Sequence, residues 1–369
     1  MNIMFFDTIE EDIFGGVEKW MGMVADGLIR RGHTMYLAGR KDSEFLRLSG
    51  STNPAINIFE LDISGDFNPA TINLISKFLK ENKIEIIVAN FNKAVRLGGL
   101  ASKLGTNTKL IWRVGLNLTK NKFIHRWLTP KLISGVISPS QALKDQIVSS
   151  GYITEAMVRV IPTGINEIET KISKTEARAK LLKKYQLPEN AVISVTSGRF
   201  VNQKGHVFLI EAAKEIVKKY DNVRFLLVGN GQLEEMLKEK IKENQLENNF
   251  VFCGFLDNYD LEFLGADFMT HPSIEEPFGI ALLEGMRAEL PVIASRVGGI
   301  PEVVTENETA LLIEPERPEL IARAIISFLD DPATMKKIGR AGFERWKNQF
   351  KYDIMVERVE HYIKEVMSC

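Results

Sequence analysis

The sequence predicts an α/β protein built from two doubly wound domains, each a parallel sheet covered by helices on both faces. Three observations support this prediction. Apolar strand-like segments alternate with helical segments along the chain, which is typical of buried parallel sheets. The alternation is interrupted once, near Pro162, and then resumes. Finally, 369 residues exceed the length at which a single hydrophobic core keeps growing.

The composition is that of an ordinary globular protein. Hydrophobic residues make up 45% and charged residues 26%, and a net charge of −1 gives no global argument for nucleic-acid binding. No apolar run reaches the roughly 18 residues of a membrane span, and the first residues lack a signal-peptide pattern. Cys253 and Cys369 have no nearby cysteine partners, so we expect no disulfide framework, no zinc site and a cytoplasmic location.

The first half of the chain begins with a βαβ pattern. Residues 1–6 read as a strand, residues 16–31 as a helix and residues 34–39 as the next strand. The connecting loop, residues 8–16, is acidic and ends in Gly15-Gly16, without the spacing of a dinucleotide fingerprint. Further strands are expected at 56–61, 84–88, 110–114, 135–138 and 158–161, with helices near 70–82, 93–104 and 140–150.

The pattern breaks at Pro162-Thr-Gly-Ile-Asn, where we place a boundary between domains at 1–163 and 164–349. A charged, lysine-rich segment, residues 171–184, follows the break. Strands are then expected at 191–197, 223–228, 250–253, 268–270, 292–295 and 310–313. Helices are expected at 205–219, 233–244, 280–286, 317–330, 332–348 and 353–367.

Cations and glycines gather where strands of the second half end. Arg199 and Lys204 follow the strand at 191–197, and two cations at that spacing can converge on one diphosphate. Gly229-Asn-Gly follows the next strand, and Phe255-Leu256 follows the strand at 250–253. Because ligands of doubly wound folds bind outside the carboxyl ends of the strands, these residues predict a phosphate-containing ligand there.

Residues 271–284 carry two carboxylates, Glu276 on a Pro-Gly loop and Glu284 on a short helix that Gly279 precedes. A helix N-terminus that faces a cleft suits an anionic ligand. Carboxylates beside it can accept hydrogen bonds from sugar or ribose hydroxyls. Two glutamates alone would also fit ordinary solvated acids, but their place beside the two cations favours a ligand site.

Positive charge is concentrated in residues 86–144, which contain no acidic residue. The basic residues there are Lys93, Arg96, Lys103, Lys109, Arg113, Lys120, Lys122, Arg126, Lys131 and Lys144. Phe123 and Trp127 lie among them. This interval is either a solvated face or an electrostatic surface for an anionic acceptor or an anionic bilayer.

Taken together, these motifs resemble the retaining GT-B glycosyltransferases of glycosyltransferase family 4, the group 1 glycosyltransferases. The resemblance rests on Arg199 with Lys204-Gly205, Gly229-Asn-Gly231, Glu276-Pro-Phe-Gly, Glu284-Gly-Met and Val297-Gly-Gly-Ile-Pro-Glu. It extends over nearly the whole chain, including the strand–Gly15-Gly16–helix pattern. The implied GT-B fold has two Rossmann-like domains facing across a cleft. Residues 350–369 would form a C-terminal helix that returns to the first, acceptor-side domain.

The resemblance also implies an activity, transfer of a sugar from a nucleotide-sugar donor with retention of its anomeric configuration. Arg199 and Lys204 would neutralise the donor diphosphate, Glu276 would bind the transferred sugar and Glu284 would bind the ribose. The other donor contacts would be the backbone of Gly15, Gly16, Gly229, Phe278, Gly279 and Ile280, and Phe255 and Leu256 around the base. No Asp-x-Asp motif occurs, so we expect no metal and no cofactor, with fixed cations supplying the charge. The glutamates are not interpreted as the acid–nucleophile pair of a hydrolase.

The chain departs from the family pattern at three places. Many members have a histidine after the strand at 110–114, where this chain has Arg113. Arg113 and His125 are therefore the acceptor-side candidates, although His125 is interpreted as a surface residue. Glu289 replaces a family glycine and would be strained if its φ is positive. Ala310 replaces another glycine.

The expected acceptor is a glycan or lipid-linked saccharide of envelope or polysaccharide synthesis, and no nucleic acid is expected as a partner. The basic interval would allow peripheral contact with an anionic membrane from the cytoplasmic side. Two alternatives are a GT-B nucleotide-sugar epimerase and a nucleotide-sugar-binding protein without turnover. The two cations followed by the glutamate pair argue against the epimerase, whereas the missing histidine is the best support for the binding protein.

Overall fold

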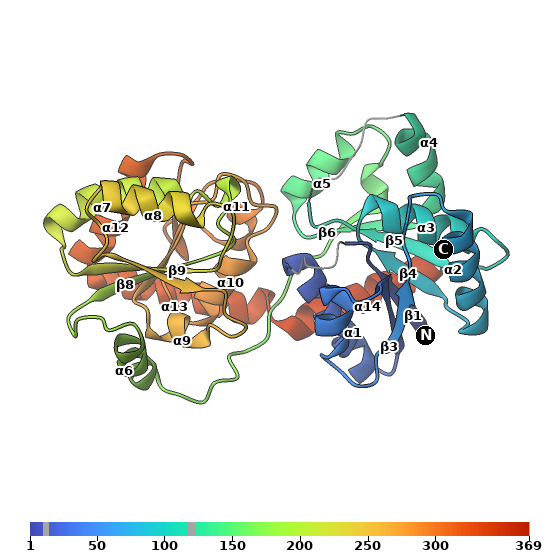
Figure 1. Ribbon diagram of the computed structural model, residues 1–369, viewed down its shortest axis with the longest axis horizontal. Helices are drawn as coiled ribbons and strands as arrows, with labels where there is room; N and C mark the ends of the chain where they lie inside the picture. The colour runs from blue at the N-terminus through green and yellow to red at the C-terminus, as the bar shows by residue number, and fades with distance from the viewer. Residues whose placement is uncertain (10–14, 117–122, 369) are drawn as a thin grey trace. The chain divides into compact units, whose positions relative to one another are not determined.

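The computed structural model describes residues 1–9, 15–116 and 123–368. Most of the acidic loop expected at 8–16, Lys120 and Lys122 of the basic interval, and Cys369 lie outside the described residues. The chain forms two compact units (Figure 1). Unit 1 comprises Met1–Thr163 together with Tyr352–Cys369, and unit 2 comprises Gly164–Lys351.

Unit 1 is built on a seven-stranded parallel sheet with the order β3-β2-β1-β4-β5-β6-β7. Its strands are β1 (Asn2–Phe6), β2 (Thr34–Arg40), β3 (Asn57–Leu61), β4 (Ile86–Ala89), β5 (Lys109–Arg113), β6 (Gly135–Ser138) and β7 (Val158–Val160). Its helices are α1 (Gly16–Arg30), η1 (Phe45–Ser49), α2 (Pro69–Glu81), α3 (Asn92–Ser102), α4 (Phe123–Leu132), α5 (Gln141–Val148), η2 (Glu155–Met157) and α14 (Tyr352–Ser368). The strand order reverses between β1 and β4, so the carboxyl ends of these strands mark the switch point of the sheet.

Alternate residues of the unit 1 strands pack into two cores, one on each face of the sheet. Ile3 and Phe5 of β1 belong to the core that α1 and α14 cover, and Met4 and Phe6 belong to the core on the other face. The last helix thus completes the core of the first unit, and Figure 1 shows α14 in red beside α1. Contact between the two helices is close, because a Cβ added to Gly27 of α1 would lie 2.5 Å from Val356.

Unit 2 has a six-stranded parallel sheet with the order β10-β9-β8-β11-β12-β13. Its strands are β8 (Val192–Ser197), β9 (Val223–Val228), β10 (Phe250–Gly254), β11 (Phe268–His271), β12 (Val292–Ser295) and β13 (Ala310–Ile313). Its helices are α6 (Lys174–Lys184), η3 (Asn202–Lys204), α7 (His206–Lys219), α8 (Glu234–Glu243), α9 (Asp260–Gly265), α10 (Ile280–Arg287), α11 (Ile300–Val303), α12 (Pro318–Asp330) and α13 (Pro332–Gln349). The order reverses between β8 and β11, which places the switch point of this sheet there.

Local sequence signals fix where several helices begin. Asn68 caps α2 by accepting a hydrogen bond from the backbone N–H of Ala70 at 2.9 Å, and Pro69 follows at the first helical position. Asp331 caps α13 in the same way, with the N–H of Thr334 at 3.1 Å and Pro332 in the first turn. These caps satisfy donors that a helix leaves unpaired at its N-terminus.

The predicted fold class is confirmed, since both units are doubly wound parallel sheets. Every expected strand is present, with ends that differ by at most two residues. Four α-helices of the described residues were not predicted, namely α6, α4, α9 and α11. The last two have 6 and 4 residues, too few to show a helical period, and α4 contains Pro130. The lysine-rich segment after the break contains α6, which buries Ala177 and Leu181.

Candidate active site

The donor-site candidates of unit 2 follow strands that are neighbours in its sheet. Lys204 follows β8, Gly229 follows β9 and Glu276 follows β11. Because β8 lies between β9 and β11, the three loops leave the same edge of the sheet beside its switch point. This is the place where ligands of open α/β sheets bind.

The loop after β8 is packed backbone to backbone against the loop after β11. Gly205 has φ 64 and a Cβ there would lie 2.0 Å from the carbonyl oxygen of Pro272, so only glycine fits. The N–H of Ile274 donates to the carbonyl of Gln203 at 2.8 Å. Arg199 lies on the same loop with an exposed side chain. The two loops therefore act as one rigid platform for the charged side chains.

Lys204 and Glu276 form an ion pair on this platform. The Lys204 Nζ lies 2.7 Å from Glu276 Oε2, and the Nε2 of His271 lies 2.9 Å from the same oxygen. The side chain of Glu276 is only 9% exposed. Burial alone would raise the pKa of Glu276, but the hydrogen bond from His271 and the charge of Lys204 lower it to about 2. Glu276 is therefore an ionised carboxylate that only accepts hydrogen bonds.

A third loop fixes the backbone of Glu276. The N–H of Gly299 donates to the carbonyl of Glu276 at 3.0 Å. Gly298 has φ 50, and a Cβ there would lie 2.0 Å from the same carbonyl oxygen. The Val297-Gly-Gly motif thus holds the Glu276 loop in place, which is a packing reason for its two glycines.

Glu284 lies on α10 and its partner is Tyr259, which the sequence reading did not single out. The Tyr259 hydroxyl donates to Glu284 Oε1, and both residues come from loops or helices beside β10 and β11. Burial, and then the charge of Glu284, raise the pKa of Tyr259, so the phenol keeps its proton. Tyr259 and Glu284 are 25 residues apart in the sequence, and no sequence pattern connects them. The pair is therefore visible only in the folded structure.

The remaining donor candidates differ in what they offer. Gly279 has φ 102 at the start of α10, and Gly229 has φ 139 with no room for a Cβ beside Gly198. Phe278 packs in the core against Phe350, so only its backbone can face a ligand. Phe255 is 63% exposed after β10, as an aromatic ring that stacks on a base would be.

Arg113 of unit 1 lies in a buried charged cluster at the end of β5. Its guanidinium stacks on the Trp20 ring at 4.8 Å, and burial lowers its pKa to about 10 although the charges of Glu18 and Asp7 oppose this. Burial and then the charge of Glu18 raise the pKa of Asp7 to about 7, against a hydrogen bond from Asn90. The cluster lies at the carboxyl ends of β1, β4 and β5, and the sequence reading found only its arginine.

The two glycines at the start of α1 differ in their contacts within unit 1. The N–H of Gly15 donates to Glu18 Oε2 at 2.8 Å, whereas Gly16 is exposed at the first position of the helix. A phosphate that approached Gly15 would meet the carboxylate of Glu18, so Gly16 is the more accessible of the two.

The interpretation of His125 as a surface residue is wrong. His125 is 7% exposed and its Nδ1 lies 3.0 Å from Nη1 of Arg96, which also pairs with Asp66. The physical reason is α4, which turns His125 towards α3. Because this helix was not predicted, His125 was not assigned to a buried helix face.

Several cations of the basic interval are likewise used inside unit 1. Lys109 donates to the carbonyl of Val366 at 2.8 Å, and Lys144 pairs with Glu155 at 3.3 Å. Lys103 is exposed beyond the end of α3, and the exposed Arg126 and Lys131 lie on α4. On the same helix Phe123 is 81% and Trp127 is 54% exposed. Lys131 stacks on the Trp127 ring at 3.7 Å.

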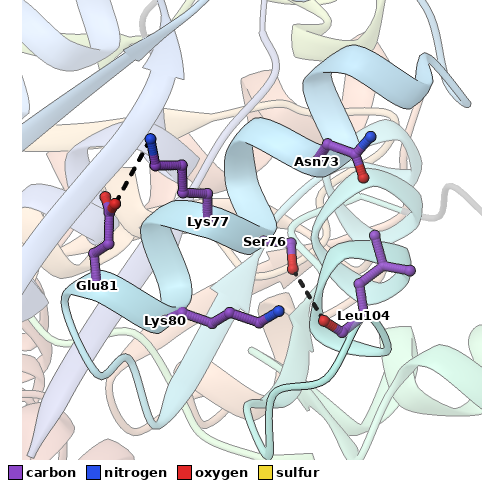
Figure 2. Close-up of a pocket in the computed structure, with 6 residues that line it drawn as sticks. All are labelled: Asn73, Ser76, Lys77, Lys80, Glu81 and Leu104. Atoms are coloured by element: carbon purple, nitrogen blue, oxygen red, sulfur yellow. Dashed lines mark hydrogen bonds and ion pairs between the residues drawn. The ribbon is translucent and has the colours of Figure 1, made fainter.

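A depression of about 470 Å³ lies on unit 1, away from these residues (Figure 2). It is lined by Asn73, Ser76, Lys77, Lys80, Glu81 and Leu104. Lys77 Nζ lies 3.7 Å from Glu81 Oε1. Its lining runs along α2 to the last residue of that helix and includes Leu104 just after α3, where the chain leads into the amino ends of β4 and β5. The depression therefore lies towards the edge of the sheet opposite to the ligand-binding edge.

No metal cluster or membrane helix is found within the described ranges. Among residues 1–9, 15–116 and 123–368, no three His, Cys, Asp or Glu side chains are grouped to hold a metal ion. None of the helices in that part of the chain is long and apolar enough to cross a bilayer. Metal independence stays a prediction, because the charge that Arg199 and Lys204 would supply is untested.

Comparison with known proteins agrees with the fold and the motifs. The sequence profile of Glycosyltransferase Family 4 matches residues 14–168, and the profile of Glycosyl transferases group 1 matches residues 177–345. Together they span most of both units. The fold and these two profiles define a nucleotide-sugar-dependent glycosyltransferase of the GT-B class. The chain belongs to glycosyltransferase family 4, a family of retaining enzymes.

Relatives of this chain include enzymes of several organisms. An uncharacterized glycosyltransferase of Methanocaldococcus jannaschii is 26% identical over 342 residues, which cover 86% of each protein. The capsular polysaccharide biosynthesis glycosyltransferase CapM of Staphylococcus aureus is 28% identical over 301 residues, covering 78% of each. The structure of Anabaena HepE in complex with UDP-glucose matches with a TM-score of 0.82 at 22% identity, over 99% of this chain and 100% of that one.

Proposed function

We propose that this glycosyltransferase transfers a sugar to a glycan or lipid-linked saccharide, with retention of configuration and without a metal ion. The observation that carries the proposal is the Lys204–Glu276 pair at the ligand-binding edge of unit 2. It supports the proposal because a cation suits a diphosphate, a carboxylate suits sugar hydroxyls, and the two lie together on one platform. The capsular polysaccharide role of the Staphylococcus aureus relative supports a glycan acceptor.

Cleavage of the bond between the anomeric carbon and the phosphate leaves negative charge on the diphosphate and positive character on the sugar. Arg199 and Lys204 stabilise the diphosphate charge electrostatically. Glu276 accepts hydrogen bonds from the sugar, and Glu284, held by Tyr259, accepts them from the ribose. The acceptor hydroxyl attacks the face that the diphosphate leaves, and a phosphate oxygen takes its proton. Neither glutamate forms a bond to the sugar.

A donor screen tests this function. UDP-glucose is the first candidate donor, because the Anabaena structure was determined with it, and GDP-mannose, UDP and GDP complete the screen. A donor that binds only the folded protein raises the Tm, and we expect this rise with EDTA present. Transfer is then measured as nucleotide release that depends on a saccharide acceptor. Loss of the Tm rise and of transfer in EDTA would refute metal independence.

Two other outcomes would favour the alternatives. An isomerised nucleotide sugar, formed without any acceptor, would identify an epimerase. Donor binding without nucleotide release, with every saccharide acceptor tried, would identify a binding protein. Mass spectrometry and proton NMR of the released sugar distinguish these results, and NMR of the glycoside also reports its anomeric configuration.

We also propose a location for the enzyme, at the cytoplasmic face of an anionic membrane through the exposed side of α4. Phe123 and Trp127 are one helical turn apart and exposed, and Lys131 lies one turn further on. Aromatic rings beside cations suit the headgroup region of an anionic bilayer. Such a location would bring the enzyme to a lipid-linked acceptor.

A further inference from the structure

His271 is the last residue of β11 and has contacts that the donor-site motifs do not explain. Its side chain is 1% exposed. The Nε2 atom lies 2.9 Å from Glu276 Oε2 and 3.0 Å from Ser273 Oγ. A buried histidine often has a purely structural role, but here its polar contact is a carboxylate of the candidate site.

The direction of the hydrogen bond follows from the ionisation of Glu276. Because the pKa of Glu276 is lowered to about 2, its carboxylate has no proton to donate at neutral pH. The proton in this contact therefore lies on Nε2 of His271, which donates to Oε2. The imidazole is rigid because it belongs to a buried strand, so it defines where this oxygen lies.

The two oxygens of Glu276 differ in their partners. Oε2 receives both His271 and Lys204, whereas no hydrogen bond from the described residues reaches Oε1. When Lys204 turns to the diphosphate, its bond to Oε2 weakens. Only His271 then remains to hold a carboxylate that is 9% exposed. A buried carboxylate without such a donor would tend to take up a proton.

We propose that His271 is a positioning residue for the transferred sugar. It holds Oε2 of Glu276, keeps the carboxylate ionised when the donor binds, and leaves Oε1 to accept a hydroxyl of the sugar. This inference rests on the proposed function and adds a residue to which that function assigns no role. Since His271 acts through Glu276, it affects recognition of the sugar and not of the nucleotide.

The test compares two substitutions of matched length. Gln in His271→Gln places an amide N–H near the position of Nε2, whereas Met in His271→Met fills similar space without a donor. Hydrogen bonds to charged groups contribute about 1.5–3 kcal/mol, so His271→Met should lower kcat/KM for UDP-glucose about ten- to a hundredfold. His271→Gln should restore most of this loss. The Kd of UDP, measured by calorimetry, should change less than about twofold in both variants.

The pH profile gives a readout that a packing defect would not produce. In the wild-type enzyme Glu276 stays ionised well below neutral pH, so it should give no acid limb above pH 5. In His271→Met the pKa of Glu276 rises, and kcat/KM should fall as the pH is lowered through the new value. His206→Met is the control, because His206 is buried in the same unit and neither of its ring nitrogens has a hydrogen-bond partner within the part of the chain that the structure describes.

The outcomes separate the inference from the function on which it rests. If the wild-type enzyme transfers no sugar from UDP-glucose or GDP-mannose, the proposed function fails and this inference fails with it. If the wild-type enzyme is active, three results would refute the inference alone. His271→Met could have the kcat/KM of the wild type, or it could lose UDP affinity as much as it loses kcat/KM. Alternatively, His206→Met could lower kcat/KM as much as His271→Met does. Should the screen select guanine, GDP and GDP-mannose replace the uridine probes. If His271→Met does not fold, His271→Asn, which is too short to reach Oε2, takes its place with the same expected loss.

Discussion

Lys204 has two possible partners, and the choice between them links binding to chemistry. In this structure its ammonium pairs with Glu276 at 2.7 Å. A diphosphate carries more negative charge than one carboxylate, so it should draw the lysine away. The ion pair thus holds the ammonium group near the place where it would meet the diphosphate. A lysine that is already ordered loses less conformational entropy on ligand binding than a mobile one.

Lys204→Met should reduce kcat/KM for transfer by about a hundred- to a thousandfold, as loss of one preorganised donor to a developing anion does. The measurement is steady-state kinetics with a saturating acceptor. Lys214→Met is a matched control, because Lys214 is exposed on α7 and, among the described residues, its ion-pair partner is Glu211 at 2.9 Å. An unchanged kcat/KM for Lys204→Met would contradict its proposed contact with the diphosphate.

Glu284→Ala should weaken binding of the nucleotide diphosphate itself, because the ribose would lose its acceptor. We expect about a tenfold rise in the Kd of UDP by calorimetry, the loss of a hydrogen bond to a charged group. Tyr259→Phe should act in the same direction but less, since it removes only the donor to Glu284 Oε1. Tighter or equal UDP binding by Glu284→Ala would argue against ribose contact.

Single residues show what sequence reasoning can reach. The spacing of Lys204, Glu276 and Glu284 pointed to one edge of a sheet, and the structure places all three beside the switch point of unit 2. His271 and Tyr259 could not be predicted, because their importance lies in which carboxylate oxygen they meet. Glu289, in contrast, is a residue whose unusual backbone was anticipated from the sequence. The suspected positive φ is present, at 57, and ion pairs with Lys174 and Arg340 accompany the strained backbone.

At the level of elements, α14 matters most for unit 1. Its apolar face packs on α1, where Gly27 gives the room that Val356 needs. Glu360 of the same helix accepts hydrogen bonds from Arg31 at 3.0 Å and meets His33 Nε2 at 3.0 Å. Apolar contact and the partly buried hydrogen bonds of Glu360 thus hold the last helix on the first unit.

Gly27→Ala should destabilise the protein although alanine favours helices. The propensity gain is at most about 1 kcal/mol, whereas overpacking of a close helix contact costs about 1–3 kcal/mol. We expect a net loss of about 1 kcal/mol in the free energy of unfolding, measured by urea denaturation. The double variant Gly27→Ala/Val356→Ala tests the cause. If the clash with Val356 is responsible, the cost of adding the methyl group should shrink once Val356 is truncated.

The apolar strands and the amphipathic helices were predictable, whereas the very short α9 and α11 and the less regular α4 and α6 were not. The β-strands stand out because they are apolar and buried on both faces, as in β4 and β12. The helix α4 was missed because exposed Phe123 and Trp127 mask its buried side. Because α4 was not predicted, the buried position of His125 could not be predicted either.

At the scale of the whole molecule, a net charge of −1 conceals the cationic side of α4. Binding to vesicles of phosphatidylglycerol and phosphatidylcholine should fall as salt rises, because exposed charges are screened within about 10 Å at 0.1 M. Lys131→Gln and Trp127→Ala should each weaken the binding in a flotation assay. Lys103→Gln is the control, since Lys103 is exposed beyond the end of α3. If binding is absent or does not depend on salt, the exposed side of α4 is an ordinary solvated surface and not a membrane-binding one.

The return of α14 to unit 1 also sets the order in which the protein can fold as it is made. Domains fold as units during translation, but Val356, Val359 and Ile363 enter the core of unit 1 only after the ribosome has released all of unit 2. Unit 2 can complete its core first, although it comes second in the sequence. Until translation reaches α14, the apolar side of α1 around Val24 and Leu28 is uncovered. We therefore expect the nascent first unit, and not the second, to expose the apolar surface that chaperones bind.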